Sequence, residues 1–232
     1  MKRRYYFIII FLILAVNMVI VIFANNKFMH ITQEIVDQSA YYSMTADYNE
    51  FPAYTEFPDI KSLENESDLV LKIKLNGQKQ YVQEDTLATA TVIESLKGES
   101  TSEIKIAEPF NINNYNTEAN VYGGYVPLNT NQEYIVFLKK TKLEEVYKYT
   151  SIEFGHFVLN KKESNILDYS NESTKSIGEI IKYDFLYIYG DTANQLEMID
   201  TRNSEELISI DMSQLKEQYK KLKRECFNKY TK

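Results

Sequence analysis

The first 24 residues constrain the chain more than any other feature. Lys2, Arg3 and Arg4 precede an apolar run from Tyr5 to Ala24, "YYFIIIFLILAVNMVIVIFA", which carries no charge. As an α-helix rising 1.5 Å per residue, this run would span about 30 Å, the thickness of a hydrocarbon core. The sequence therefore predicts a single transmembrane helix over residues 5–24.

The charges around this run predict its orientation. Three bases lie before it and only Lys27 lies close after it, so residues 1–4 are expected in the cytoplasm and the bulk of the chain outside it. The alternative is a cleavable signal peptide, with Ile22 and Ala24 at the small-residue positions before the cut. The length of the run favours a retained cell-membrane anchor over a signal peptide. Both alternatives place the remaining residues outside the cytoplasm.

After the apolar run, the pattern changes twice. Residues 25–58 include Pro52 and Pro58 without a clear period, which indicates a stalk. From Asp59, runs of apolar and β-branched residues alternate with turn residues, as in "DLVLKIKLN" at 68–76, where a strand with one buried face is expected. Further strands are expected within residues 86–96, 103–110, 133–140, 146–160, 183–190 and 206–212, and short helices within 59–68 and 176–182. Many short strands with little helix between them predict a mainly β fold, an antiparallel sheet closed on itself.

The C-terminal residues predict an amphipathic helix. Leu215, Tyr219, Leu222 and Cys226 follow the spacing i, i+4, i+7, i+11 of one apolar stripe. The expected organisation is a cytoplasmic tip at 1–4, a transmembrane anchor at 5–24, a stalk at 25–58, a barrel at 59–163, and C-terminal strands and helix at 164–232 packed on the barrel.

Charge and composition exclude several functions. The whole chain carries a net charge of −7, and setting aside the four bases of the first 27 residues leaves −11. An acidic domain lacks the electrostatic footprint of a nucleic-acid binder, so no nucleic-acid partner is expected. With two histidines, one cysteine and no catalytic motif, the sequence predicts no metal site, no cofactor and no catalytic residue. The composition, poor in cysteine and rich in Lys, Ile, Asn and Tyr, suits an exported Gram-positive protein.

Four short motifs occur in a fixed order between residues 60 and 160. They are Ser67-Asp68-Leu69-Val70 after a short helix, Leu96-Lys97-Gly98 at the end of a long strand, the pair Gly123-Gly124, and the set Leu128, Tyr134, Phe137 and Leu138. In this order they resemble Gram-positive exported proteins with an OB-like barrel of the netrin/TIMP-like (NTR-like) group. The resemblance implies a small OB/NTR-like barrel with short flanking helices. Metalloprotease inhibition in that group uses an N-terminal cysteine, which this chain lacks.

Physical reasoning gives the Leu-Lys-Gly motif a structural role. Gly98 can adopt a positive φ, which suits the corner where a long strand must turn. Lys97 is expected to be a solvated charge at the strand end, where it would discourage edge-to-edge pairing.

The segment 111–127 is the best sequence candidate for a binding surface. The residues that mark it are Tyr115, Tyr122, Gly123, Gly124 and Tyr125. Tyrosines beside flexible loop residues are typical of adaptable recognition surfaces, and loops on a rigid barrel often bind ligands. The competing interpretation is a turn whose tyrosines cover the end of the barrel.

The sequence favours a membrane-anchored binding module over an enzyme. Its expected partners are the lipid bilayer, through Tyr5 to Ala24, and an extracytoplasmic protein or envelope ligand. One alternative is an exported cell-envelope hydrolase that uses carboxylates, which leave no sequence motif. The other is a structural accessory subunit of a membrane complex.

Overall fold

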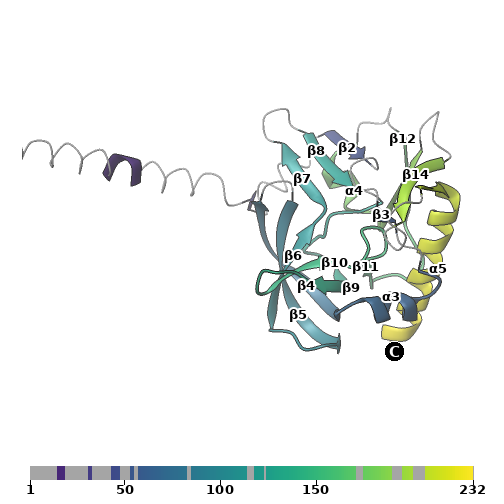
Figure 1. Cartoon of the computed structure of the whole chain (residues 1–232), viewed down its shortest axis with the longest axis horizontal. Helices are drawn as coiled ribbons and strands as arrows, with labels where there is room; N and C mark the ends of the chain where they lie inside the picture. The colour runs from purple at the N-terminus through teal and green to yellow at the C-terminus, as the bar shows by residue number, and fades with distance from the viewer. Residues whose placement is uncertain are drawn as a thin grey trace, which may run out of the picture.

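The barrel predicted from the sequence is present. The computed structural model of the chain describes residues 15–18, 31–32, 43–47, 53–54, 57–82, 85–113, 118–122, 124–170, 175–189, 195–200 and 207–231. Five strands form a closed ring in the order β4-β5-β6-β10-β9, with β9 pairing back to β4 (Figure 1). These strands are β4 (Leu69–Val82), β5 (Asp85–Lys97), β6 (Glu103–Glu108), β9 (Glu133–Lys140) and β10 (Val146–Tyr149).

The prediction of a wholly antiparallel barrel was wrong at one pair. β6 and β10 run parallel, with Tyr147 opposite Ile106, whereas the other four pairs of the ring are antiparallel. The reason is the odd number of strands, because a ring of five cannot alternate direction all the way round. In the order β9-β4-β5-β6, three consecutive strands lie beside a fourth that returns next to the first, which is a Greek key.

The barrel core follows from the alternation of apolar residues along each strand. On β4, Leu69, Leu71, Ile73 and Leu75 are at most 4% exposed, whereas Lys74 is exposed. β6 shows the same period of two, since Ile104 and Ile106 are buried between more exposed neighbours. The alternation read from the sequence therefore places the inward faces of these strands correctly.

Smaller sheets and three helices surround the barrel. Two strands extend the barrel sheet: β1 (Ile31–Thr32) pairs along β4, and β11 (His156–Val158) pairs along β9. One three-stranded sheet joins β2 (Ser43–Asp47), β8 (Glu118–Tyr122) and β7 (Phe110–Asn113), and another joins β3 (Ala53–Tyr54), β14 (Gln195–Asp200) and β15 (Leu207–Asp211). A two-stranded sheet pairs β12 (Ile166–Ser170) with β13 (Phe185–Tyr189). The helices are α3 (Ile60–Glu66), α4 (Ile177–Ile180) and α5 (Met212–Tyr230). β1, β2 and β3 come from the segment expected to be a stalk, so parts of that segment pair with strands of the domain.

The C-terminal third contributes no strand to the closed ring among its described residues, but it packs on the barrel. The four residues of the predicted apolar stripe on α5 are all 0% exposed, which confirms the amphipathic helix. Tyr219 stacks on Phe185 of β13 with ring centroids 4.5 Å apart, and its ring lies 5.4 Å from that of Phe157 on β11. Figure 1 shows α5 along the flank of the molecule opposite β4 and β5.

The short helix and the Leu-Lys-Gly motif interlock. The α3 helix begins at the N-cap Asp59, whose carboxylate accepts from the Ser62 N–H at 2.7 Å. At its other end, Lys97 Nζ donates to the carbonyl oxygens of Glu64 and Ser67, both at 2.7 Å. The expectation that Lys97 is simply a solvated strand-end charge was wrong, because its ammonium caps the C-terminal carbonyls of a helix.

Gly98 and Asp68 complete this corner. Gly98 has φ +78°, as predicted, and a Cβ there would lie 2.5 Å from Leu69 Cδ2 and 2.7 Å from the Asp68 carbonyl oxygen. The Asp68 carboxylate accepts from the Lys140 N–H at 2.8 Å at the end of β9. The Ser67–Val70 motif, the Leu96–Gly98 motif and Leu138 of the fourth set, whose carbonyl oxygen accepts from the Asp68 N–H at 2.8 Å, therefore meet at one end of the barrel, where they hold α3, β4, β5 and β9 together.

The predicted transmembrane segment lies almost wholly outside the described residues. Residues 15–18 are helical, and Val16 and Met18 are 53% and 68% exposed. Within the described parts of the chain, no helix is both long and apolar enough to cross a membrane.

Candidate functional site

The predicted tyrosine site divides into buried and undescribed residues. Tyr125 is 0% exposed, and Gly124 is buried, with its carbonyl oxygen accepting from the Leu186 N–H at 3.0 Å. A Cβ on Gly124 would overlap the ring of Phe185, so this glycine permits a close approach of the loop to β13. Tyr115 and Gly123 lie outside the described residues. Tyr122 ends β8, and its side chain is likewise outside them.

Tyr125 belongs to a buried polar cluster that sequence reasoning missed. Lys79 on β4 forms an ion pair with Glu108 on β6 at 2.7 Å, and the side chains are 1% and 0% exposed. Glu108 also accepts from the Tyr125 hydroxyl at 2.6 Å and from the Leu128 N–H at 2.8 Å. Lys79 Nζ donates to the Leu128 carbonyl oxygen at 3.0 Å and lies 5.6 Å from the centroid of the Phe110 ring. The pair therefore holds the backbone of Leu128 from both sides.

Aromatic rings extend this cluster from Tyr125 to His156. The rings of Tyr125, Tyr134 and Tyr149 lie 5.0 to 5.9 Å from the ring of His156, which is 2% exposed. Burial raises the pKa of the Tyr125 and Tyr149 hydroxyls and lowers the pKa of His156 to about 3. Because every member is buried, the cluster offers no surface to a ligand, and its polar groups act on the fold.

A second buried ion pair fastens α5. Lys223 pairs with Asp184 and also donates to the Glu163 carbonyl oxygen at 3.1 Å. Asp184 accepts from the Asn165 N–H at 2.7 Å, and its carbonyl oxygen accepts from the Tyr219 hydroxyl at 3.0 Å. The residues on both sides of Ser164 are thus tied to this ion pair, which fixes the segment 163–165 against the helix.

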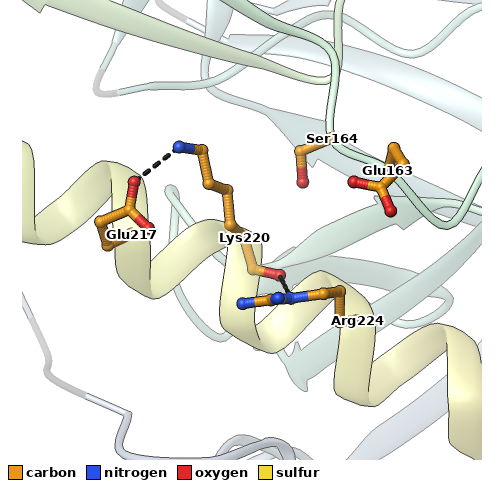
Figure 2. Close-up of a pocket in the computed structure, with 5 residues that line it drawn as sticks. All are labelled: Glu163, Ser164, Glu217, Lys220 and Arg224. Carbon is orange, nitrogen blue, oxygen red and sulfur yellow. Dashed lines mark hydrogen bonds and ion pairs between the residues drawn. The ribbon is translucent and has the colours of Figure 1, made fainter.

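A groove runs along α5 beside this fixed segment. Two contiguous hollows of about 160 and 400 Å³ share Glu217 and Lys220. We call them together the α5 groove, which is lined by Glu163, Ser164, Tyr187, Ser213, Gln214, Lys216, Glu217, Lys220 and Arg224. Figure 2 shows Glu163 and Ser164 on one segment facing Glu217, Lys220 and Arg224 on the helix.

Three bases line the groove at successive turns of the helix. Lys216, Lys220 and Arg224 are four residues apart and so share one face of α5. Lys216 pairs with Asp168 at 2.7 Å and lies 4.8 Å from the Tyr187 ring centroid; Asp168 and Tyr187 are themselves cross-strand neighbours.

The other two bases differ in their partners. Lys220 pairs with Glu217 at 2.5 Å. Arg224 Nε donates to the Lys220 carbonyl oxygen at 3.3 Å, and within the described residues no carboxylate pairs with its guanidinium. Among the described residues, Arg224 is therefore the base of the groove without a carboxylate partner, and it retains guanidinium donors for a ligand.

Ser164, which lines the same hollow, carries an unsatisfied polar atom. Its Oγ is buried and has no hydrogen-bond partner among the described residues. A buried hydroxyl without a partner costs about 1–3 kcal/mol, and such atoms in folded proteins usually meet a water molecule or a ligand. Because both neighbours of Ser164 are fixed, this hydroxyl is held in place facing the helix.

Together these groups can bind a small polar molecule. Arg224 offers a planar fork of donors that matches a carboxylate or a phosphate, and the Ser164 hydroxyl can donate or accept. The Glu163 carboxylate lines the same hollow and can accept from an ammonium or hydroxyl group. Sequence reasoning missed the groove because the bases of α5 read as ordinary charges of a C-terminal helix, and because residues 163–168 approach them only in the folded chain.

No group of three or more His, Cys, Asp or Glu side chains that could hold a metal ion occurs among the described residues. Cys226 is buried, and burial raises the pKa of its thiol. No protein-family model, curated protein or solved structure matches the chain.

Proposed function

We propose that the protein is a membrane-anchored, extracytoplasmic binding module whose α5 groove takes the anionic group of a small polar ligand. The observation that carries the ligand site is the fixed, buried Ser164 hydroxyl without a partner, facing a hollow that Arg224 also lines. The barrel serves as the rigid support, and Lys223 and Asp184 hold the two sides of the groove together.

We further propose that the barrel is of the OB/NTR-like kind. The five-stranded ring with a Greek-key order supports this proposal, since the OB-fold is a five-stranded Greek-key barrel. The meeting of three motifs at the α3 end supports it as well, because these are motifs on which the resemblance rests.

The anchor is proposed from the apolar run between Tyr5 and Ala24. The run is uncharged and long enough to cross a bilayer, and the bases before it favour an extracytoplasmic domain. The exposed Val16 and Met18 in the helical residues 15–18 suit a helix that faces lipid.

The lining of the groove defines the ligand by chemistry. A bidentate contact with Arg224 requires a carboxylate or a phosphate. Beside it, Glu163 favours a ligand that also carries an ammonium or hydroxyl group. The ion pair between Lys220 and Glu217 is exposed, so breaking it to admit a ligand costs little, about 0–1 kcal/mol.

The test is an NMR titration of the full chain in detergent micelles, with acetate and glycine as probes. Both probes carry a carboxylate, but only glycine adds an ammonium group for Glu163. We expect the amide signals of residues 163–165 and 216–224 to shift with roughly millimolar affinity. Glycine should bind more tightly than acetate, and Glu163→Gln should remove that difference.

Matched variants distinguish the groove from general charge attraction. Arg224→Gln and Ser164→Ala should abolish the shifts, whereas Lys142→Gln, which removes one exposed base from the distant turn between β9 and β10, should leave them unchanged. Equal loss with Lys142→Gln, or no shift with either probe in the intact protein, would show that the groove is not the site. The anchor is tested separately by flotation of the full chain with liposomes.

A further inference from the structure

The pairing of β1 with β4 shows from which side the anchor reaches the barrel. Ile31 lies opposite Lys79 and Thr32 opposite Gln78, in an antiparallel pair. β4 runs toward its last residue Val82, which pairs with Asp85, the first residue of β5. We call this end of the barrel the hairpin end. Because β1 runs against β4, the chain before Ile31 arrives from the hairpin end.

The short connection limits how far this end can stand from a membrane. Between Ala24, the last residue of the proposed anchor, and Ile31 there are six residues. Seven steps of an extended chain reach at most about 25 Å. β4 continues from Lys79 to Val82 toward the anchor, which takes about 10 Å of that reach. The hairpin end therefore stands within about 15 Å of the hydrocarbon, and headgroups fill about 5–8 Å of this gap.

We propose that the hairpin end of the barrel sits against the lipid headgroups, so that the domain rests on the bilayer instead of standing off on a stalk. This inference rests on the proposed anchor. The partner is the lipid surface itself, and the opposite end, with α3, Lys97 and the turn between β9 and β10, faces away from it. The α5 groove on the flank stays open to the aqueous phase.

The same geometry places the segment 111–127 relative to the membrane. β7 begins at the hairpin end, since the Thr86 hydroxyl donates to the Phe110 carbonyl oxygen at 2.6 Å and Thr86 lies opposite Glu108. Residues 111–127, predicted from the sequence to bind a partner, therefore start on the membrane side.

The experiment measures energy transfer from single labels on the full chain to acceptor headgroups in phosphatidylcholine vesicles. One label is placed by Gln80→Cys near the hairpin end, and the other by Lys142→Cys beyond the far end of β9. The eleven residue steps of β4 from Leu69 to Gln80, tilted in a barrel, separate the two heights by about 25 Å. Transfer should be at least about twofold higher from Gln80 because of this height difference. Cys226 is buried, so the wild-type protein should take up little label and serves as the blank.

A longer connection provides the control. Twenty inserted Gly/Ser residues after Asn26 add a flexible span of about 25 Å and should lower transfer from Gln80 to the level of Lys142. Equal transfer from both labels with the native connection, or higher transfer from Lys142, would overturn the inference while the anchor stands. Failure of the protein to float with the vesicles would overturn the anchor, and the inference would fall with it.

Discussion

Among the described residues, two buried lysine–carboxylate pairs differ in their surroundings. In the barrel, Lys79 and Glu108 are 1% and 0% exposed, and their other hydrogen bonds go to a tyrosine hydroxyl and to the backbone of Leu128. At the seam between α5 and the 163–165 segment, Lys223 and Asp184 are 1% and 6% exposed. The first pair lies inside one structural unit, and the second joins two.

The two regions differ in how they can relax after one charge of the pair is removed. Removing one partner of a fully enclosed pair leaves a charge that neither water nor a neighbouring group can reach, and the loss is large. A pair at a seam can regain water when the two units separate slightly, so the loss is smaller and local. The barrel pair should therefore govern global stability, and the seam pair should govern how firmly α5 is docked.

The largest effect is expected from Lys79→Met. The variant leaves the Glu108 carboxylate buried beside Tyr125 without a counter-charge, which should lower the free energy of unfolding by about 3–5 kcal/mol. Chemical denaturation of the full chain in mild detergent measures the change.

Two variants serve as controls for that loss. Replacing both charges, in Lys79→Met with Glu108→Leu, should recover much of the stability, because the unpaired charge is then absent. Lys72 lies on β4, as Lys79 does, but its ion pair with Glu133 of β9 is more exposed, with side chains 27% and 47% exposed. Breaking this pair with Lys72→Met should cost about 0–1 kcal/mol. If Lys79→Met is as mild as Lys72→Met, the enclosed pair does not stabilise the barrel.

The next effect depends on pH and concerns His156. Burial lowers its pKa to about 3, so between pH 6.5 and 3 the unfolded chain binds a proton that the folded chain does not. The free energy of unfolding should then fall as the pH falls through this range, and His156→Phe should flatten that slope. Denaturation midpoints of both proteins between pH 7 and 4 provide the measurement.

Glu153 should change stability with pH in the opposite direction, which provides a check on the assignment of the acid effect to His156. Burial raises the pKa of this carboxyl, so from its ordinary value upward the folded chain keeps a proton that the unfolded chain loses. Stability should fall as the pH rises through that window, and Glu153→Gln should remove the fall. An unchanged acid slope in His156→Phe would mean that another group takes up the proton.

Local patterns were enough to predict much of the fold. The alternation of apolar residues identified β4 and β9, the latter with its observed bounds at Glu133–Lys140. The stripe of α5 and the short helix α3 were also readable, because each depends on neighbours within a few residues. β2, β12 and β14 were not predicted, although β13 and β15, the partners of β12 and β14, were; each of the three is defined by its pairing with another strand, which its own local pattern does not reveal.

The positions of the buried ion pair in the barrel can be read from the same alternation along the strands. Lys79 occupies an odd-numbered position of β4, as do the inward Leu71 and Ile73, and Glu108 continues the inward even-numbered positions of β6. Two opposite charges on inward faces of nearby strands predict an interior ion pair. The α5 groove has no such trace in the sequence, because its two sides are separate in the sequence and meet only in the folded chain, through contacts such as Lys223 with Asp184 and Lys216 with Asp168.

The smallest loss of stability is expected from Asp184→Asn, and the part of the molecule that it loosens is more informative than its size. The variant removes the counter-charge of Lys223 but keeps an acceptor for the Asn165 N–H, and the Asp184 side chain is 6% exposed. The free energy of unfolding should fall by about 1–3 kcal/mol. Hydrogen exchange should quicken in α5 and at residues 163–165 while the amides of β4 stay protected.

Asp168→Asn is the matched control for this variant, because it removes the partner of another lysine of α5, Lys216. In this pair the Lys216 side chain is 25% exposed and the Asp168 side chain 55%, so the variant should leave hydrogen exchange in α5 nearly unchanged. Faster exchange in β4 after Asp184→Asn would show that the helix and the barrel unfold as one cooperative unit. In that case the two ion pairs would stabilise the same transition, and Lys79→Met should then quicken exchange in α5 to the same extent. Protection retained in β4 would instead mean that α5 can loosen while the barrel stays folded, and with it one wall of the α5 groove.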